Sequence, residues 1–570
     1  MNSREKLIEK MFNKGILVNE DMLDKLGSRL NQGAAGLDEN LFEKIEAEED
    51  LVVLNSDYTE IIQQQSFLVD WYEVDRYKVE AEKDRGNALY RSQLQEFKNS
   101  NLKLDLKLDL KLDIPSLKPE QKEQEIKYIE PEVNLNGKGK ISFDSVYDPE
   151  QGQSSVESLI YFRNEPQKHK LEGFTRLFVS RYKFLESLLR NRQELTHTLN
   201  ISRILEKKEK ENVSLIGMVK ERGETKTGHI IITLEDLTGE IKVLISRTKN
   251  EIFLEGRDLV VDEVIGINGT SSDKIVFAEK IVWPDVPNNS LKKSENEEYV
   301  IFLSDIHVGS NLFLQEEFEK FLKWLRGEIG NESQRAIAHK VKYIFIAGDV
   351  VDGVGIYPSQ EEELKIVDLK GQFDEFSRLI SKIPLNKQII ICPGNHDGVH
   401  LAEPQPVFYR KYAEELFKLP NVKLVTNPSL INIGKTKSFC GFDVLMYHGY
   451  SFDYYIANVA SIRTGGGYRR SDMIMKFLLK RRHLAPSFKS TPYYPSHQED
   501  PLLIKTIPDF FLTGHIHYTC VANYKGITMI SGSCWQDKTA FQDKLGHKPE
   551  TGRVPIVNLK TRQVKVLRFH

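Results

Sequence analysis

The sequence predicts a multidomain protein of the α/β plus β class, and three observations lead to that prediction. The chain has 570 residues, which is more than one hydrophobic core holds, and domains of roughly 150 residues would give about three or four. Residues 213–284 alternate short apolar runs with Gly, Asp and Thr, a pattern typical of strands joined by turns. From about residue 297 onward apolar runs alternate with helical segments, as in α/β sheets.

Composition limits the classes of function. Lys and Arg number 79 against 83 Asp and Glu, so any contact with nucleic acid must come from local patches. The four cysteines are far apart and form no C-x-x-C pair, which argues against a zinc ribbon or a disulfide framework. The first residues contain no apolar signal core, and no run approaches the ~20 apolar residues of a membrane span. We therefore expect a cytoplasmic protein with no membrane partner.

The first 210 residues predict three segments. Residues 1–65 carry apolar positions at helical spacing, which predicts a small helical module whose stripes are core rather than a cofactor site. Residues 66–155 include NLKLDLKLDLKLDIP and flanking polar runs, so we expect a low-complexity linker, although the leucines also suit an edge strand or a docking strip. Residues 156–210 contain a strongly helical stretch and predict a helical connector.

Residues 211–290 predict a small closed β-barrel. Five strands in about seventy residues are typical of the OB type of barrel. Such barrels often bind single-stranded nucleic acid through exposed aromatic side chains. Phe253, Phe277 and Trp283 are equally suited to the barrel core, so a purely structural barrel explains the pattern at least as well.

Residues 291–570 contain five apolar runs, and each run ends in side chains that bind metals. The carboxyl ends of strands in an open α/β sheet share one rim, so we expect these side chains to converge. They are Asp305 with His307, then Asp349, then Asn395 with His396 and Asp397, then His448, and finally His515 with His517.

These residue types favour a particular chemistry. Imidazole and carboxylate ligands suit manganese, iron, zinc or nickel, and the lack of clustered thiolates argues against a structural zinc. Because an Asp can bridge two ions, the set suits two metals about 3.5 to 4 Å apart that activate water and bind a phosphate ester. We expect phosphodiester hydrolysis, with water rather than Ser304 as the nucleophile.

The ordered motifs D-x-H, G-D, G-N-H-D, H-G and G-H-x-H resemble those of the calcineurin-like metallophosphoesterases. The resemblance implies a β-sandwich flanked by helices. It also implies that Asp305, His307, Asp349 and His517 bind one ion, and that Asp349 bridges to a second ion. By the same resemblance Asn395, His448 and His515 hold the second ion, whereas His396 acts near the leaving group.

A narrower resemblance comes from GDVVDGVGIYPSQEEEL, GNHDGVHLAEPQP and LLKRRHLAPSF. With the barrel and the linker, these segments are similar to the small subunits of archaeal family D DNA polymerases over roughly residues 155–570. The resemblance implies a proofreading 3′ to 5′ exonuclease that acts on DNA with a 3′ end and is nucleoid-associated. It further implies a separate large catalytic subunit, in a heterodimer or heterotetramer, and two divalent ions: manganese first, with magnesium, iron, nickel or zinc as alternatives. Eukaryotic counterparts have lost the ligands, whereas every ligand position is filled here.

Two further sets of residues lie beside the motifs. We expect Asp352 and Asp397 to orient imidazole rings and not to bind metal themselves. The basic segment 465–489 either forms a solvated helix face with no binding role or contacts the phosphate backbone of DNA. The second role predicts DNA binding by Arg469, Arg470, Lys480, Arg481 and Arg482.

Two other functions stay open at this point. One is a phosphatase or cyclic-nucleotide phosphodiesterase that uses the same metals. The other is a catalytically silent scaffold that holds the large polymerase subunit.

Overall fold

The computed structural model describes residues 156–160, 162, 171–195, 197–207, 209–272, 274–495, 499–544 and 548–569, and the backbone of 17–18 and 53–54. The chain divides into two compact units, one of residues 1–69 and 89–154 and the other of residues 70–88 and 155–570. In the first unit, β1 (Leu17–Val18) pairs in parallel with β2 (Val53–Leu54). Apart from these strands, the helical module and the linker predicted before residue 156 lie outside the described residues.

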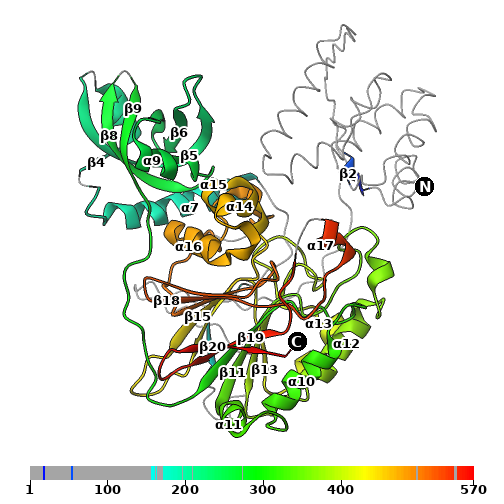
Figure 1. The fold of residues 1–570 in the computed structure, drawn as a ribbon. Coiled ribbons are helices and arrows are strands. Elements are labelled where there is room, and N and C mark those ends of the chain that lie inside the picture. Colours follow the sequence, from blue (N-terminus) through cyan, green and yellow to red (C-terminus); the bar gives the residue numbers. More distant parts are fainter. Residues whose placement is uncertain are drawn as a thin grey trace, which may run out of the picture. The chain divides into compact units, whose positions relative to one another are not determined.

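Two six-stranded sheets form the centre of the second unit (Figure 1). In the first sheet β10 to β13 run parallel, while β19 and β20 are antiparallel to their neighbours. Its order is β13 (Val422–Leu424), β12 (Gln388–Cys392), β11 (Val341–Ala347), β10 (Tyr299–Leu303), β19 (Arg553–Asn558) and β20 (Val564–Arg568). The order of the second is β17 (Cys520–Tyr524), β18 (Ile527–Ser531), β16 (Phe510–Thr513), β15 (Phe442–Met446), β14 (Ser429–Ile433) and β3 (Val156–Ile160).

The inner faces of the two sheets share one apolar core. Phe302 of β10 and Phe345 of β11 stack with ring centroids 5.7 Å apart, and Phe510 of β16 lies 5.6 Å from Phe302. Because both faces of β10, β11 and β12 are buried, these strands are continuous apolar runs rather than alternating ones. The sheets therefore form a sandwich, and β3 extends its second sheet from a segment in which the sequence predicted only helix.

Helices cover both outer faces of the sandwich. The outer face of the first sheet packs against α10 (Gln315–Leu325), α11 (Glu332–Lys340) and α12 (Leu369–Ile380). The outer face of the second packs against α7 (Leu171–Arg190), α14 (Phe452–Asn458), α15 (Ala460–Thr464) and α16 (Ser471–Arg481). This arrangement confirms the mixed α/β class predicted from the sequence.

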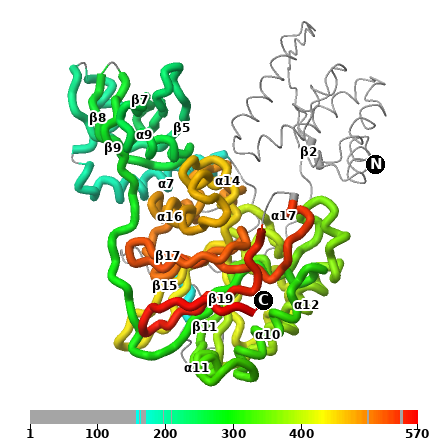
Figure 2. Tube along the Cα trace, in the orientation of Figure 1, coloured from blue at the N-terminus to red at the C-terminus, as the bar shows by residue number. Residues whose placement is uncertain are grey.

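Short elements complete the described part of the chain. The α-helices among them are α8 (Ile201–Glu206), α13 (Arg410–Ala413) and α17 (Ala540–Lys544). Four 3₁₀ turns are η1 (Gln360–Glu363), η2 (Leu416–Lys418), η3 (Gly467–Arg469) and η4 (Phe488–Ser490). The tube in Figure 2 follows the same path from α7 to the C-terminal strands.

A closed five-stranded barrel lies between β3 and β10 in the chain. Its order is β5-β6-β7-β9-β8, and antiparallel pairing of β8 with β5 closes it. Trp283 is buried and Phe253 packs on the core, whereas Phe277 is 43% exposed. The strands are β5 (Glu211–Glu224), β6 (Ile230–Asp236), β7 (Gly239–Ile245), β8 (Val264–Ser272) and β9 (Ile275–Val282), with α9 (Asn250–Arg257) between β7 and β8 and with β4 (Thr198–Leu199) beside β5.

A buried ion pair anchors α7 to the sandwich. Arg181 is fully buried, and its Nε lies 2.7 Å from Asp500 Oδ2. The guanidinium also donates to the Pro486 carbonyl and to the Tyr493 hydroxyl. His483 Nε2 lies 2.9 Å from the same Asp500 oxygen. Burial alone would raise the pKa of Asp500, but Arg181 and His483 hold that pKa below its usual value.

No helix among the described residues is long and apolar enough to cross a membrane.

We predict that Arg181→Met lowers the free energy of unfolding by about 3 to 5 kcal/mol, because it leaves the buried Asp500 carboxylate without its charged partner. Urea unfolding followed by tryptophan fluorescence measures the loss. The matched control is Arg190→Met on the same helix, which removes an ion pair with Glu186 whose arginine is 44% exposed. Exposed pairs contribute about 0 to 1 kcal/mol, so equal losses in the two variants would contradict the anchoring role of Arg181.

Candidate metal centre

The seven predicted ligands converge where five strands end. Three motifs follow β10, β11 and β12 of the first sheet, and two follow β15 and β16 of the second sheet. The expectation of a single shared rim is therefore wrong. Parallel strands end together within each sheet, and the packing of the two sheets brings these two rims beside each other.

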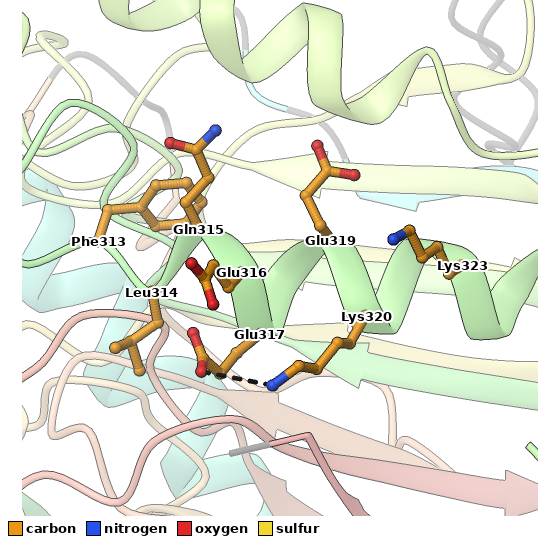
Figure 3. A pocket seen from close by; sticks show the side chains of 8 residues that line it. All are labelled: Phe313, Leu314, Gln315, Glu316, Glu317, Glu319, Lys320 and Lys323. Carbon is orange, nitrogen blue, oxygen red and sulfur yellow. Dashed lines mark ion pairs between the residues drawn. The ribbon is translucent and has the colours of Figure 1, made fainter. Parts of the chain in front are cut away.

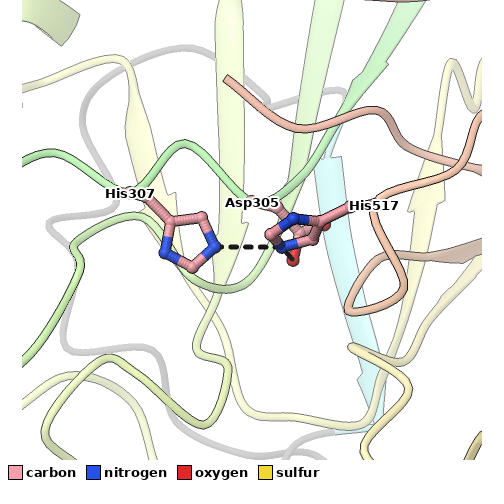
Figure 4. A group of neighbouring side chains, drawn as sticks. All are labelled: Asp305, His307 and His517. Atoms are coloured by element: carbon pink, nitrogen blue, oxygen red, sulfur yellow. Dashed lines mark hydrogen bonds and ion pairs between the residues drawn. The ribbon is translucent and has the colours of Figure 1, made fainter. Parts of the chain in front are cut away.

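The first group consists of Asp305, His307 and His517, which are all buried (Figure 4). The Nε2 atoms of the two histidines lie 3.1 Å apart, and His517 Nε2 lies 3.5 Å from Asp305 Oδ1. In Figure 4 the two rings approach each other beside the carboxylate. Two imidazole nitrogens and a carboxylate oxygen thus surround one small volume.

The second group consists of Asp349, His448 and His515. His448 Nε2 lies 3.2 Å from Asp349 Oδ2 and 2.9 Å from the side-chain oxygen of Asn395. The two groups adjoin, because the main-chain N–H of His515 donates to the Asp305 carboxylate at 3.0 Å. The structure therefore brings together all seven residues predicted to bind metal.

The backbone around the site is strained. Residues other than glycine seldom adopt positive φ, and such conformations cluster at functional sites. Five of the seven predicted ligands adopt it, with φ between 50° and 71°: Asp305, His307, Asp349, His515 and His517. Since this geometry is unfavourable for the chain alone, it indicates that the positions of the side chains, rather than stability, determine the local conformation.

The glycines of the motifs allow the loops to approach each other closely. A Cβ atom on Gly394 would lie 2.2 Å from Asp349 Oδ1, and one on Gly514 would lie 2.6 Å from Asp305 Oδ2. Both contacts are shorter than any real Cβ contact, so a larger residue would displace a predicted ligand. The glycine in G-N-H-D and the glycine in G-H-x-H thus have a steric explanation.

Asp352 orients His307, as the sequence predicted. Its Oδ1 lies 3.1 Å from His307 Nδ1 and accepts a hydrogen bond from Gln536, while its Oδ2 accepts one from Gln360. With both oxygens engaged by protein donors, Asp352 fixes the imidazole and leaves Nε2 for an ion.

The expected role of Asp397 as an orienter of an imidazole is wrong. Its carboxylate accepts main-chain hydrogen bonds from Val350, Val351 and Gly394, which join the loops after β11 and β12. Burial and the nearby Asp349 carboxylate raise the pKa of Asp397 to about 7. Asp397 therefore organises the backbone that carries the ligands.

Other groups orient the remaining histidines. The Ala347 carbonyl accepts from His448 Nδ1 at 2.8 Å, and Asp453 lies 2.8 Å from His515 Nε2. Sequence reasoning missed Asp453, Gln360 and Gln536. Asp453 lies five residues after His448, and the glutamines belong to no metal-ligand pattern, so only the fold associates them with the site.

His396 lies beside the two groups but is positioned differently. Its Nδ1 lies 2.7 Å from the Asp352 carbonyl, so this nitrogen carries the hydrogen and Nε2 faces the site, 3.9 Å from Asp349 Oδ2. Its side chain is 15% exposed. A partly exposed imidazole with its second nitrogen directed at the site has the geometry of a proton donor.

The charges of the site indicate that a cation fits there. Burial lowers the pKa of His448, but Asp349 outweighs that effect and raises it to about 10. Burial alone would raise the pKa of Asp349, but His448 and His396 hold that pKa well below its usual range. Buried carboxylates that stabilise positive charge this strongly, with nitrogen and oxygen donors close by, suit a divalent ion.

The predicted DNA contacts do not form one exposed basic face. Arg481 is buried and pairs with Glu263 of the barrel at 2.7 Å, and Arg482 donates to the carbonyls of Ile504 and Lys505. Both guanidinium groups are engaged by other parts of the same chain, so their assignment to phosphate contacts is wrong.

The other three predicted DNA contacts differ from one another. Lys480 lies over the Trp283 ring, with Nζ 3.7 Å from its centroid. Arg469 and Arg470 are exposed, and Arg470 pairs with Asp472. Within this set, only Arg469 and Arg470 are exposed.

The hollow drawn in Figure 3 is a different feature. Phe313, Leu314 and six polar residues of α10 line it, and it contains none of the predicted site residues. The candidate centre is therefore defined by the convergence of ligands and not by this hollow.

The fold and the site together define a mixed α/β protein with a candidate centre for two ions. The family of the B subunits of DNA polymerases alpha and epsilon matches residues 300–521. The DNA polymerase II small subunit of Methanothermobacter thermautotrophicus is 40% identical over 392 residues, which are 69% of this chain and 78% of that protein. The chain belongs to the family of archaeal DNA polymerase II small subunits, the small subunits of family D.

Other relatives and solved structures give further comparisons. The DNA polymerase II small subunit of Archaeoglobus fulgidus is 39% identical over 68% of this chain and 75% of its own length. That of Pyrococcus furiosus is 36% identical over 70% of this chain and 64% of its own length. Asparaginyl-tRNA synthetase from Pyrococcus horikoshii aligns with only 15% of this chain and 22% of its own, at 16% identity and a TM-score of 0.14.

We predict that Asp352→Asn weakens manganese binding about 10- to 100-fold, because the neutral side chain holds the His307 ring less firmly. Isothermal titration calorimetry of the full chain measures the affinity. Asp374→Asn, a change at an exposed ion pair of α12 with Lys370, is the control and should bind as the parent does. Parental affinity in Asp352→Asn would contradict the orienting role.

Proposed function

We propose that the chain is the proofreading subunit of a two-subunit DNA polymerase and a metal-dependent 3′ to 5′ exonuclease. The observation that carries this proposal is the convergence of all seven predicted ligands in two adjoining groups. Relatives named as polymerase subunits make DNA the natural substrate. The helix-flanked sandwich supports a calcineurin-like metallophosphoesterase domain, and the strand order and closure of the barrel support the OB type.

In this proposal Asp305, His307 and His517 hold one ion, and Asn395, His448 and His515 hold the other, with Asp349 between them. Two divalent ions at these positions would supply Lewis-acid stabilisation of the phosphate and lower the pKa of water. Manganese is the first choice, and magnesium, iron, nickel or zinc are alternatives, because the donors are imidazole, carboxylate and amide oxygen.

The protein's own groups determine how the substrate reacts. The loops after five strands fix the ligands through buried hydrogen bonds, so the site is formed before the substrate arrives. As an imidazolium, with hydrogens on both ring nitrogens, His396 transfers the proton at Nε2 to the departing oxygen of the ester. Its Nδ1 hydrogen bond to the Asp352 carbonyl keeps the ring in that orientation.

The partners follow from the family. We propose that the chain binds a large catalytic subunit, in a heterodimer or heterotetramer, and DNA with a 3′ end. The cytoplasmic, nucleoid-associated location predicted from the sequence stays a prediction. A silent scaffold and a phosphatase or cyclic-nucleotide phosphodiesterase are the alternatives that the following experiment separates.

We predict that the purified chain with manganese releases the label of a 3′-labelled single strand as a mononucleotide and converts a 5′-labelled strand into a ladder. Denaturing gels of both reactions measure the polarity, and a chelator should stop both. Metal binding without cleavage, alone and with the large subunit, would favour the scaffold. Rapid hydrolysis of small phosphomonoesters with DNA left intact would favour the phosphatase.

We predict that Asp349→Ala abolishes cleavage more completely than loss of any single terminal ligand, because one carboxylate serves both ions. Single-turnover rates in saturating manganese measure this effect, with Asp374→Ala as the control for the loss of a carboxylate. Cleavage near the parental rate in Asp349→Ala would contradict the shared site.

We predict that His396→Ala keeps its manganese and slows cleavage about 10²- to 10⁴-fold, because general acid catalysis typically contributes that factor. Calorimetry and single-turnover kinetics on one preparation separate the two quantities. Loss of metal from this variant would assign His396 to the ligand set instead.

A further inference from the structure

Two aromatic rings stack beside the candidate proton donor. Tyr357, in the loop before η1, and Phe541, in α17, have ring centroids 5.4 Å apart and an interplanar angle of 18°. The Tyr357 ring centroid lies 6.5 Å from that of His396. We call the rings of Tyr357 and Phe541 the aromatic platform. Neither ring belongs to a proposed metal ligand or to the proposed proton donor.

The aromatic platform is held in place from two sides. One oxygen of the Glu363 carboxylate accepts from the Tyr357 hydroxyl at 2.8 Å, and the other accepts from the Ala540 main-chain N–H at 3.1 Å. Gln542, which follows Phe541, lies 3.1 Å from Nδ1 of the predicted ligand His517. Glu363 thus joins the two ring-bearing segments, and Gln542 ties α17 to the metal centre.

The platform is also partly exposed, because Tyr357 is half-buried and Phe541 is open to solvent. Phe541 is 42% exposed, and the neighbouring Val354 and Ile356 are 43% and 37% exposed. An aromatic ring fixed in place but left partly open to solvent suits a planar ligand that stacks on it. Nucleobases stack on aromatic side chains with little dependence on sequence.

The chemistry identifies which base would lie there. Release of a 3′-terminal mononucleotide forms a bond from water oxygen to phosphorus and breaks the bond from phosphorus to the O3′ of the penultimate nucleotide. The electron pair stays on that O3′, which takes a proton from His396, and the proton of the water passes to solvent. The penultimate nucleotide therefore lies on the His396 side of the scissile phosphate.

We propose that the aromatic platform stacks the base of the penultimate nucleotide and so positions the scissile phosphate of a single-stranded 3′ end. This inference rests on the proposed exonuclease function and deepens it. It also implies that the substrate strand is unpaired at this position, because the platform needs an accessible face of the base.

Steady-state kinetics on a single-stranded oligonucleotide with manganese test the platform. Phe541→Ala should raise KM about 5- to 100-fold, since loss of one base–aromatic contact has an effect of that size, and Phe541→Trp should restore the parental KM. Tyr409→Ala removes an aromatic side chain of nearly equal exposure, 43% against 42%, outside the barrel and the metal centre, and should leave KM unchanged. An equal rise in Tyr409→Ala, or no rise in Phe541→Ala, would overturn the proposal.

An abasic substrate identifies the position of the stacked base. In the parent protein, an abasic site at the penultimate position should raise KM as Phe541→Ala does, whereas one at the terminal position should raise it less. Combined with Phe541→Ala, the penultimate abasic site should have little further effect, because the two changes remove the same contact. Additive effects would overturn the assignment.

A binding measurement separates this inference from the proposed function. With calcium in place of manganese, an oligonucleotide carrying 2-aminopurine at the penultimate position should lose fluorescence on binding the parent, and much less on binding Phe541→Ala. This readout does not need hydrolysis. Quenching with calcium, combined with no cleavage of the same oligonucleotide with manganese, would overturn the exonuclease and retain the platform. Cleavage with equal quenching by both proteins would overturn the platform alone, and would leave the exposed Phe541 as a contact for another protein chain.

Discussion

Asp349 is the residue on which the rest of the site depends. Its main-chain carbonyl accepts from the N–H groups of Ile306 and His307, so it holds the loop after β10. One carboxylate oxygen accepts from the His396 N–H at 2.8 Å, and the other lies 3.2 Å from His448 Nε2. One buried residue thus connects loops from both sheets, and its positive φ of 50° is compatible with all these contacts.

This constraint explains why the motifs could be recognised in sequence. Each ligand must follow closely after the end of a strand. The apolar runs in the sequence therefore predicted the strands, and the polar residues directly after those runs predicted which side chains converge. The single rim was wrong because the sequence does not say which strands share a sheet. Strands β10, β11 and β12 belong to one sheet and β15 and β16 to another, and only long-range pairing decides this.

The basic segment 465–489 shows that sequence alone does not reveal whether a charged side chain is exposed or paired with a distant residue. A run such as Lys480, Arg481 and Arg482 looks exposed because nothing nearby neutralises it. In the fold, Arg481 meets Glu263, 218 positions away in the sequence, and Glu263 also accepts from the Trp283 indole. A buried charge is retained only with such partners, and this one joins α16 of the sandwich to the barrel. Asp453 and Gln536 escaped prediction for the same reason.

The central claim is that two ions occupy the two groups of ligands on either side of Asp349. Anomalous diffraction from crystals grown with manganese tests it most directly. The account predicts two peaks in the anomalous difference map, one among Asp305, His307 and His517 and the other among Asn395, His448 and His515, with the Asp349 carboxylate between them. A map with no peak at these residues, or with a single peak that Asp349 does not touch, would contradict it.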